Sequence, residues 1–319
     1  MQSPSISLQS RDLAVLQGLF ETRVMTTDHI AVLFFENRRP YTTKRLQRLK
    51  TAGLIGERRR RVNEPAILFL TTKGLRALKD AGLLSEIDVP SAASFARRAN
   101  VSEQTLRHEL SVMDVKAAFH AALAGSDQFA SFDFQTWPHL YEFQVAGLGS
   151  GGRDKPLKPD GFLRIDVRGE LENPYRYYLE IDRSTEAQHR LVAKALCYRQ
   201  HYFSGDFAVR HGGSRDKIED FPFRVLMIFR TADRRNNTAE RLLRANPPFM
   251  TQVCLSTMEG VVANPLGPIW IQPRDYRAVV AGTRFDVDRK GWAIAFRPQP
   301  DRNALVEARI PKFRLLSES

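Results

Sequence analysis

Acidic residues at three places in the chain have the types and spacing to bind a divalent metal ion. Glu109 lies in a helical pattern, Asp160 follows Pro159, and Glu180 and Asp182 lie two residues apart in the segment YYLEID. Hard cations such as Mg²⁺ bind a few converging carboxylates together with water. A metal ion held in this way activates water and neutralises charge on a phosphate, which is the chemistry of phosphodiester hydrolysis.

These acids can meet only if two strands lie side by side. Residues 162–169 and 175–183 are rich in aromatic and β-branched residues and predict a hairpin. Asp160 precedes the first strand, whereas Glu180 and Asp182 share one face of the second, because side chains alternate along a strand. We therefore expect the hairpin to bring Asp160 close to Glu180.

Each acid also has a purely structural interpretation. Glu180 and Asp182 match the solvated face of an amphipathic strand. Asp160 and the glycine after it form an ordinary turn pair. Glu109 borders the apolar stripe of its helix, where helical pairing would explain it. The sequence leaves these alternatives open.

The rest of this region alternates between helix and strand. Residues 102–125 predict a long helix that Ser102 caps and Gly125 ends. Residues 146–159 predict a glycine-rich loop, and residues 250–319 suggest short strands of undetermined order. Further strands are predicted over residues 131–137 and 223–231, and helices over residues 187–203 and 238–244.

Positive charge is concentrated at the start of the chain. The sequence holds 48 Lys and Arg against 36 Asp and Glu, a net charge of +12. Residues 1–84 hold fifteen of those cations and seven of the acids, and so carry +8 of the excess. Such clustering favours a polyanionic partner over a uniformly solvated basic surface.

The pattern of residues 1–84 is typical of a winged helix-turn-helix. The segments LIGERRRR and AILFLTT flank Asn63-Glu64-Pro65 and predict strand, turn and strand. In a winged helix-turn-helix the third helix enters the major groove of DNA. Helices are predicted over residues 10–23, 27–36, 41–53 and 73–81, with Ser10, Thr26 or Thr27, and Thr71 or Thr72 as caps.

Eleven residues of this segment are candidate DNA contacts. Those on or before the third helix could reach base edges and phosphates, and the arginines of the wing could reach phosphates or a minor groove. The candidates are Arg38, Arg39, Thr42, Thr43, Lys44, Arg45, Arg48, Arg58, Arg59, Arg60 and Arg61. Winged helices also bind proteins, but the number of arginines favours DNA.

Length and composition narrow the class of protein. A chain of 319 residues suggests two domains, here residues 1–84 and 102–319 with a polar linker over 85–101. The hydrophobic content of 43% excludes a mostly disordered chain, and no apolar run reaches the roughly 20 residues of a membrane span. Two cysteines exclude a disulfide scaffold, and the first residues do not resemble a signal peptide, so we expect a cytoplasmic protein.

The ordered set of motifs resembles two known groups. A helix with Glu109, then Pro159-Asp160, then Glu180-Ile181-Asp182 before another helix resembles the PD-(D/E)XK nuclease-like fold. A winged helix followed by RHEL, KPDG and YYLEIDRST is similar to the replication-relaxation family, over roughly residues 8–205. Members of that family are encoded on plasmids and other mobile elements and are similar to the mobilisation protein C group.

The resemblance implies roles for particular residues. Asp160 and Glu180 would be the central catalytic residues and metal ligands, Glu109 would be the helix carboxylate, and Mg²⁺ would be the cofactor. The chain departs from the motif at Asp182, where active nucleases of the fold carry a lysine that positions the attacking water.

Three explanations for this departure stay open. Asp182 is an additional metal ligand, or the basic role has moved along the chain, or the domain has kept the fold and lost catalysis. For a migrated base, Lys194 on the following helix is the first candidate, and Arg183 and Arg190 are weaker ones.

We therefore predict an α+β protein in which a winged helix-turn-helix precedes a PD-(D/E)XK-like domain. We expect it to bind double-stranded DNA in replication, relaxation or mobilisation, with replication or mobilisation proteins as further partners and no membrane. A Mg²⁺-dependent endonuclease or nickase and a non-catalytic transcriptional or replication regulator are both compatible with the sequence. It leaves open the oligomeric state and the role of residues 205–319.

Overall fold

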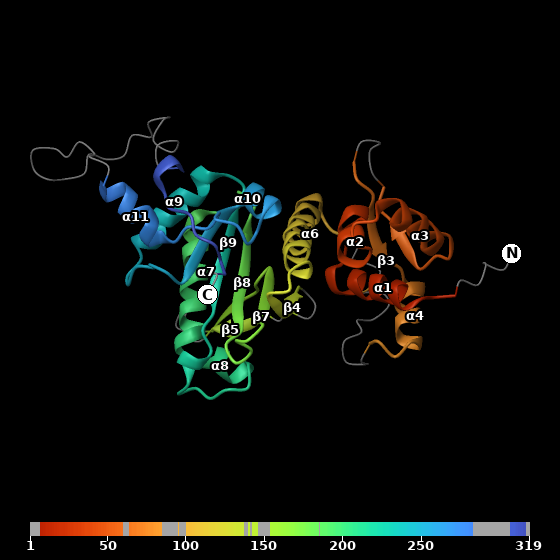
Figure 1. Ribbon diagram of the computed structural model, residues 1–319, viewed down its shortest axis with the longest axis horizontal. Coiled ribbons are helices and arrows are strands. Elements are labelled where there is room, and N and C mark those ends of the chain that lie inside the picture. Colours follow the sequence, from red (N-terminus) through yellow and green to blue (C-terminus); the bar gives the residue numbers. More distant parts are fainter. Residues whose placement is uncertain are drawn as a thin grey trace, which may run out of the picture. The chain divides into compact units, whose positions relative to one another are not determined.

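The structure is a computed structural model of a mixed α+β protein, as the sequence predicts (Figure 1). The chain divides into two compact units, residues 1–125 with 136–139 and residues 126–135 with 140–319. The predicted linker over residues 85–101 lies mostly outside the described residues, and the division into units falls after the long helix that follows it. The structure describes residues 7–59, 64–84, 95, 100–136, 140, 142–145, 154–184, 186–282 and 307–316.

The first unit combines helices with one small sheet. The predicted helices and hairpin are confirmed, and a two-residue strand, β1, is additional. Strand β3 is central and runs antiparallel to both β1 and β2. The elements are α1 (Ser10–Thr22), β1 (Met25–Thr26), α2 (Thr27–Phe34), α3 (Arg39–Thr51), β2 (Ile55–Glu57), β3 (Ile67–Leu70), α4 (Thr72–Asp80) and α6 (Glu103–Ala124).

Side-chain caps fix where three of these helices begin. Thr26, Thr71 and Ser102 each accept a hydrogen bond from the backbone N–H three residues later. Each cap satisfies a donor that the first helical turn leaves without a partner. The predicted cap of α1, Ser10, is wrong, because Gln9 occupies the cap position.

One apolar core holds the first unit together. Leu46 and Leu49 of α3 pack with Leu16 and Phe20 of α1, and Met113 of α6 joins the same cluster. The apolar stripe predicted for α3 is therefore confirmed as its buried face. Helix α3 begins two residues earlier than predicted, because Pro40 is tolerated in a first helical turn that does not need its missing N–H.

The second unit is built around a five-stranded sheet of order β10-β9-β8-β7-β4 (Figure 1). Strands β4, β7 and β8 run antiparallel, and β8, β9 and β10 run parallel. Helix α7 links β8 to β9, as a connection between parallel strands requires. The strands are β4 (Phe129–Gln135), β5 (Phe143–Val145), β6 (Lys155–Leu157), β7 (Gly161–Val167), β8 (Tyr175–Asp182), β9 (Arg224–Phe229) and β10 (Val253–Thr257).

The helices of the second unit differ from the sequence prediction towards the end of the chain. Two helices and one strand occupy residues 253–282, where short strands were expected, and β6 lies within the predicted loop 146–159. Helix α9 is longer than the predicted segment 238–244. The helices are α7 (Gln188–Phe203), α8 (Asp206–Arg210), η3 (Ile218–Asp220), α9 (Ala232–Leu243), α10 (Met258–Ala263) and α11 (Pro273–Gly282).

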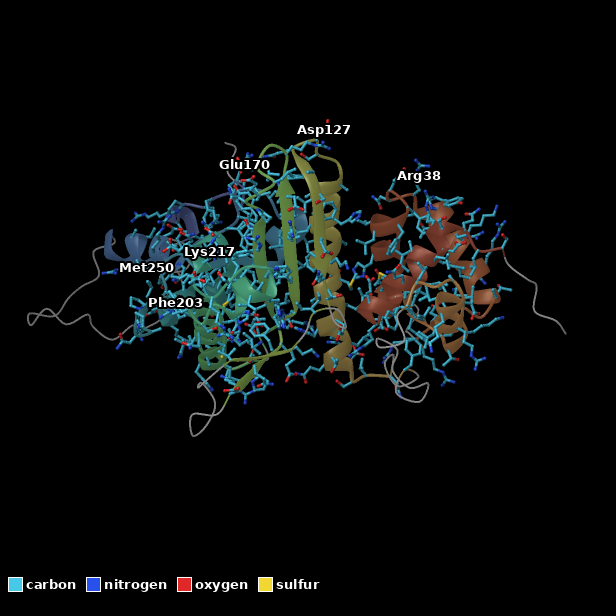
Figure 2. The ribbon with its side chains drawn as sticks, turned by 90° about the horizontal axis from the view of Figure 1, so that it is seen from below. Arg38, Asp127, Glu170, Phe203, Lys217 and Met250 are labelled. Carbon is cyan, nitrogen blue, oxygen red and sulfur yellow. The ribbon has the colours of Figure 1, made fainter. Side chains whose placement is uncertain are left out.

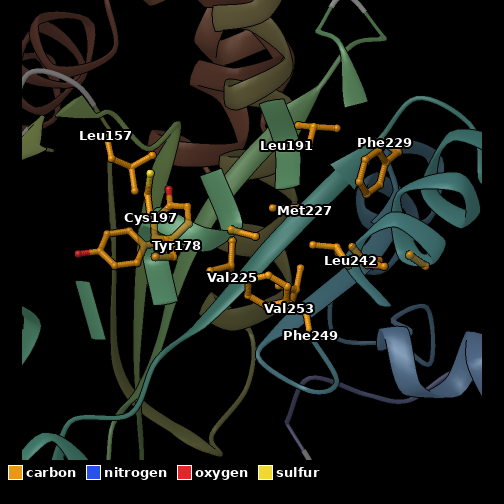
Figure 3. Close-up of a cluster of buried hydrophobic side chains, with 14 of the residues drawn as sticks. Leu157, Tyr178, Leu191, Cys197, Val225, Met227, Phe229, Leu242, Phe249 and Val253 are labelled. Carbon is orange, nitrogen blue, oxygen red and sulfur yellow. The ribbon is translucent and has the colours of Figure 1, made fainter. Parts of the chain in front are cut away.

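Aromatic and aliphatic side chains fill the space between this sheet and α7. The rings of Tyr178 on β8 and Tyr198 on α7 lie 5.0 Å apart. Val225, Val253 and Phe249 lie together in the same cluster (Figure 3). Because both faces of β8 are covered, all its residues from Arg176 to Asp182 are buried.

The described part of the tail, residues 307–316, packs on the second unit. Phe313 forms a β-bridge with the buried Trp270, and the Tyr177 hydroxyl donates to the Leu315 carbonyl at 3.3 Å. Glu307 pairs with the buried Arg235 of α9. Among the described residues, no helix combines the length and the apolar character of a membrane span.

Candidate functional site

Glu180 and Lys194 form an ion pair in the middle of the second unit's sheet. Glu180 lies on β8, the middle strand, and its side chain is 1% exposed. Lys194 Nζ of α7 donates to Glu180 Oε2 at 2.8 Å, and the Tyr198 hydroxyl donates to Oε1 at 2.6 Å. Lys194 and Tyr198 are four residues apart, so the helix presents both side chains to one carboxylate.

The hairpin of β7 and β8 places Asp160 beside this pair. The Ile181 N–H donates to Asp160 Oδ2 at 2.7 Å, and the Asp160 N–H donates to the Leu179 carbonyl at 3.0 Å. Both partners flank Glu180 on β8. The structure therefore brings Asp160, Glu180 and Lys194 together, and we call these three residues the carboxylate–lysine site.

Burial and neighbouring charges set the protonation of this site. Burial raises the pKa of Glu180 and the charge of Asp160 raises it further, whereas Lys194 and the two hydrogen bonds lower it. The net effect raises the pKa of Glu180 from 4.5 to about 7. Burial lowers the pKa of Lys194, but the charges of Glu180 and Asp160 outweigh that effect and raise it. Lys194 is therefore a cation at neutral pH.

Asp182 has partners of its own. It forms an ion pair with Arg234 of α9, whose Nη2 donates to Asp182 Oδ1 at 3.1 Å. The Ser184 N–H donates to the same oxygen at 3.1 Å. Glu180 and Asp182 are both buried, so the interpretation of this face as a solvated strand surface is wrong.

Glu109 lies in the first unit, on α6, where Arg23 Nη1 lies 3.3 Å from its Oε1. Asp160 and Glu180 lie in the second unit. Within the described ranges, no three His, Cys, Asp or Glu side chains form a group that could hold a metal ion. The acids that the structure brings together are the pair Asp160 and Glu180.

Helix α3 presents a polar stripe to solvent. Its exposed residues recur at helical spacing opposite the buried Leu46 and Leu49. The stripe carries two cations of the sequence prediction, Lys44 and Arg48, without acids between them. It consists of Thr43, Lys44, Gln47, Arg48 and Thr51.

Two predicted contacts on α3 belong instead to the core. Thr42 is fully buried and its hydroxyl donates to the Arg38 carbonyl at 2.9 Å. Arg45 is 8% exposed and forms an ion pair with Asp12 of α1, with Nε donating to Oδ1 at 2.6 Å. Burial withdraws both side chains from the solvent-exposed surface of α3.

The other predicted cations lie outside this stripe. Arg38 is exposed (Figure 2) and pairs with Glu36. Arg39 lies 3.2 Å from Asp28. Arg58, after β2, donates to the Val101 carbonyl at 3.4 Å, and Arg59 is exposed. Arg60 and Arg61 lie outside the described residues.

Sequence reasoning did not assign the roles of Tyr198 and Arg234. The tyrosine follows Lys194 by one helical turn, so the i, i+4 spacing was a usable signal once the lysine was chosen. Arg234 follows Asp182 by 52 residues, and the sequence holds no local signal for that pair.

Comparison with known proteins identifies a family. A family model described as replication-relaxation matches residues 16–216, well over half of the chain. No curated protein and no solved structure matches the chain. The matched range contains α3 and all three residues of the carboxylate–lysine site. The chain belongs to the replication-relaxation family.

Proposed function

We propose that this protein binds double-stranded DNA and acts in the replication, relaxation or mobilisation of a plasmid or another mobile element. Membership of the replication-relaxation family supports the biological role. In this proposal the first unit is a winged helix-turn-helix that anchors the duplex. The second unit is a PD-(D/E)XK-like domain that cuts or nicks one strand, and further partners would be replication or mobilisation proteins.

The order of elements in the first unit supports the winged-helix proposal. Helices α1, α2 and α3 precede the β2–β3 hairpin, and β1 completes the small sheet. The polar stripe of α3 would lie in the major groove, with Lys44 and Arg48 reaching phosphates or guanine edges. Arg59 would contact the backbone from the wing.

The carboxylate–lysine site carries the nuclease proposal. In the five-stranded sheet the antiparallel strands β4, β7 and β8 come before α7 and the parallel strand β9. Asp160, Glu180 and Lys194 meet where β7, β8 and α7 come together. Lys194, 2.8 Å from Glu180, supplies the positive charge that position 182 lacks. This is the arrangement expected if the basic role has moved from the strand to the helix.

The donor chemistry of Asp160 and Glu180 fits Mg²⁺. A divalent cation would offset the burial of Glu180 and its repulsion by Asp160, the two effects that raise its pKa. The bound ion would supply activated water and neutralise phosphate charge. Glu180 Oε2 would have to exchange part of its contact with Lys194 for the ion. Titration calorimetry with Mg²⁺ alone should show binding to the wild type and not to Asp160→Asn.

Protein residues would do the remaining work. Tyr198 holds the Glu180 carboxylate in one orientation from α7. Lys194 contacts both Glu180 and Glu186, at 2.8 and 3.2 Å, so its ammonium group is fixed between two acids. Such a positioned cation would stabilise negative charge that develops on a phosphate.

A nicking assay tests the proposal. Supercoiled plasmid incubated with the protein and Mg²⁺ or Mn²⁺ should relax for the wild type but not for Asp160→Asn or Glu180→Gln. Asp133→Asn removes an exposed carboxylate from β4 of the same sheet and should cut like the wild type. Equal nicking by all four proteins would assign the cleavage to a contaminant or another site.

A non-catalytic transcriptional or replication regulator is the second candidate. It is favoured by the engagement of both Glu180 oxygens by Lys194 and Tyr198, and by the pairing of Asp182 with Arg234. For such a protein, the wild type would shift duplex DNA in a gel without nicking it, and Asp160→Asn would leave the shift unchanged.

A further inference from the structure

A cavity of about 260 Å³ lies beside the carboxylate–lysine site, wholly within the second unit. The second half of α7 forms one wall, and residues 222–225 and 249–253 form the others. Its lining is dominated by aromatic rings. These rings belong to Tyr198, Tyr202, Phe203, Phe223 and Phe249.

The mouth of the cavity exposes an aromatic ring to solvent. Phe203 at the end of α7 is 60% exposed, and its ring lies 5.4 Å from that of Tyr202. Phe203 and Met250 lie at the same end of the second unit (Figure 2). A concave surface whose rim carries large apolar side chains is more often a binding site than a surface without them.

The charge of the cavity is positive. Arg199 and Arg224 both line it, and the described lining residues include no acid. The Arg199 guanidinium stacks 3.5 Å above the Phe249 ring, and its Nη1 donates to the Pro247 carbonyl at 2.7 Å. Among the described residues, the buried Nε and Nη2 of Arg199 find no hydrogen-bond acceptor.

Aromatic walls, two arginines and guanidinium N–H groups without acceptors together favour a flat ligand that has polar edges and carries negative charge nearby. Buried N–H groups without acceptors cost free energy, which an acceptor brought beside the guanidinium would recover. Nucleobases offer a π-face for aromatic rings, ring nitrogens and carbonyl oxygens as acceptors, and an attached phosphate for the arginines. An aliphatic side chain of a protein partner would leave the arginines without counter-charge.

Tyr198 links the cavity to the carboxylate–lysine site. Its ring lines the cavity, while its hydroxyl donates to Glu180 at 2.6 Å. A base in the cavity would thus contact the ring of the tyrosine whose hydroxyl holds the Glu180 carboxylate.

We propose that this cavity binds one unpaired nucleobase. The inference rests on the proposed function, because the base would belong to the strand whose phosphate lies at the carboxylate–lysine site. Free nucleotides carry the same chemistry, so both sources are tested.

Fluorescence of 2-aminopurine tests the proposal in the full-length protein. A single-stranded oligonucleotide carrying one 2-aminopurine is titrated with protein in EDTA, alongside the free 2-aminopurine nucleotide. Stacking on aromatic rings should quench the base. Quenching of the oligonucleotide alone identifies a base within a strand, whereas equal affinity for the free nucleotide identifies a nucleotide site. No quenching of either probe overturns the proposal.

Two variants locate the bound base. Thr251→Trp fills the cavity from its partly exposed rim, and Tyr202→Ala removes one stacking ring. Tyr202→Ala should weaken binding of the quenched probe about tenfold, the scale of one lost stacking contact. Thr251→Trp should weaken it at least as much, because the new side chain occupies the space of the base. Asp133→Asn, an exposed residue of β4 outside the cavity, should bind like the wild type. Quenching that neither variant reduces would place the base elsewhere and overturn the proposal.

Duplex binding, measured in parallel by anisotropy, separates the two proposals. Retained duplex binding without quenching of either probe would overturn the proposed base-binding cavity and would leave the proposed function unaffected. Loss of duplex binding with quenching intact would contradict the proposed anchoring by the first unit and not the cavity.

Discussion

The protonation of Glu180 links the candidate site to the stability of the second unit. Its pKa of about 7 in the folded protein lies above the ordinary value of 4.5, because burial disfavours the carboxylate. Between these pH values the folded state binds more protons than the unfolded state. The contribution of Glu180 to the free energy of unfolding is thus complete below pH 4.5 and is lost as pH rises through 7.

We predict that Glu180→Gln removes this pH dependence. The free energy of unfolding of the variant, relative to wild type, should increase between pH 5 and pH 7.5, by at most about 1.4 kcal/mol per pH unit. Urea unfolding at both pH values measures the change, and Asp133→Asn serves as the control. Parallel pH profiles for wild type and Glu180→Gln would show that Glu180 does not titrate in this range.

Removal of Lys194 tests the charge balance at the same site. In Lys194→Met, Glu180 loses its cationic neighbour, so its pKa should rise further and nicking should fall at neutral pH. Breaking one side of a buried ion pair costs about 3–5 kcal/mol, and the partial exposure of Lys194 puts this case at the low end. Adding Glu180→Gln should recover part of the lost stability. Additive losses in the double variant would argue against direct coupling.

At the scale of elements, the packing of α1 against α3 depends on one buried pair. Arg45→Met would leave Asp12 buried, 1% exposed, without its cation. We expect the first unit to lose about 3–5 kcal/mol. Arg48→Met, on the exposed stripe of the same helix, should change stability by no more than about 0.5 kcal/mol. Chemical unfolding of both variants checks this, and equal losses would contradict the assigned role of Arg45.

The same pair shows how far sequence patterns reach. Apolar periodicity located α3 and its buried leucines correctly, because burial of apolar area follows the helical repeat. The same periodicity predicted that Arg45 faces solvent, because the pattern carries no information about an acid on another helix. Alternation along β8 put Glu180 and Asp182 on one face correctly. The contacts that bury that face come from Tyr198 and Arg234 on α7 and α9, which no local pattern connects to β8.

For the whole molecule, binding to duplex DNA should depend on salt in proportion to its phosphate contacts. In a plot of the logarithm of the association constant against the logarithm of the salt concentration, the magnitude of the slope falls by about 1 for each phosphate contact that is lost. Lys44→Ala and Arg48→Ala should each reduce the slope by that amount if both residues contact phosphates. Lys217→Ala, in the second unit, should leave the slope of duplex anchoring unchanged. Slopes unaffected by the α3 variants would place the duplex elsewhere.

The family match ends at residue 216, yet the sheet that carries Glu180 is completed by strands beyond it. Residues 177–182 of β8 pair with β9, and Glu307 in the tail forms an ion pair with Arg235 of α9. Burial lowers the pKa of that arginine to about 10, and its Nη2 donates to Glu307. The described residues 217–282 and 307–316, beyond the end of the family match, thus belong to the same folding unit as the site.

We therefore predict that deletion of residues 307–319 destabilises the second unit. The deletion leaves Arg235 without its carboxylate and uncovers Trp270, which pairs with Phe313. An uncompensated buried charge alone costs about 3–5 kcal/mol, and for a unit of this size each kcal/mol lowers Tm by about 2–4 °C. Calorimetry should thus show a drop of at least about 6 °C. Glu307→Gln keeps the packing of the tail and removes only the carboxylate charge. The drop in Tm of this variant therefore measures the contribution of the ion pair, and the rest of the drop after deletion measures the contribution of packing. An unchanged Tm after deletion would show that residues 307–316 do not support the sheet that carries Glu180.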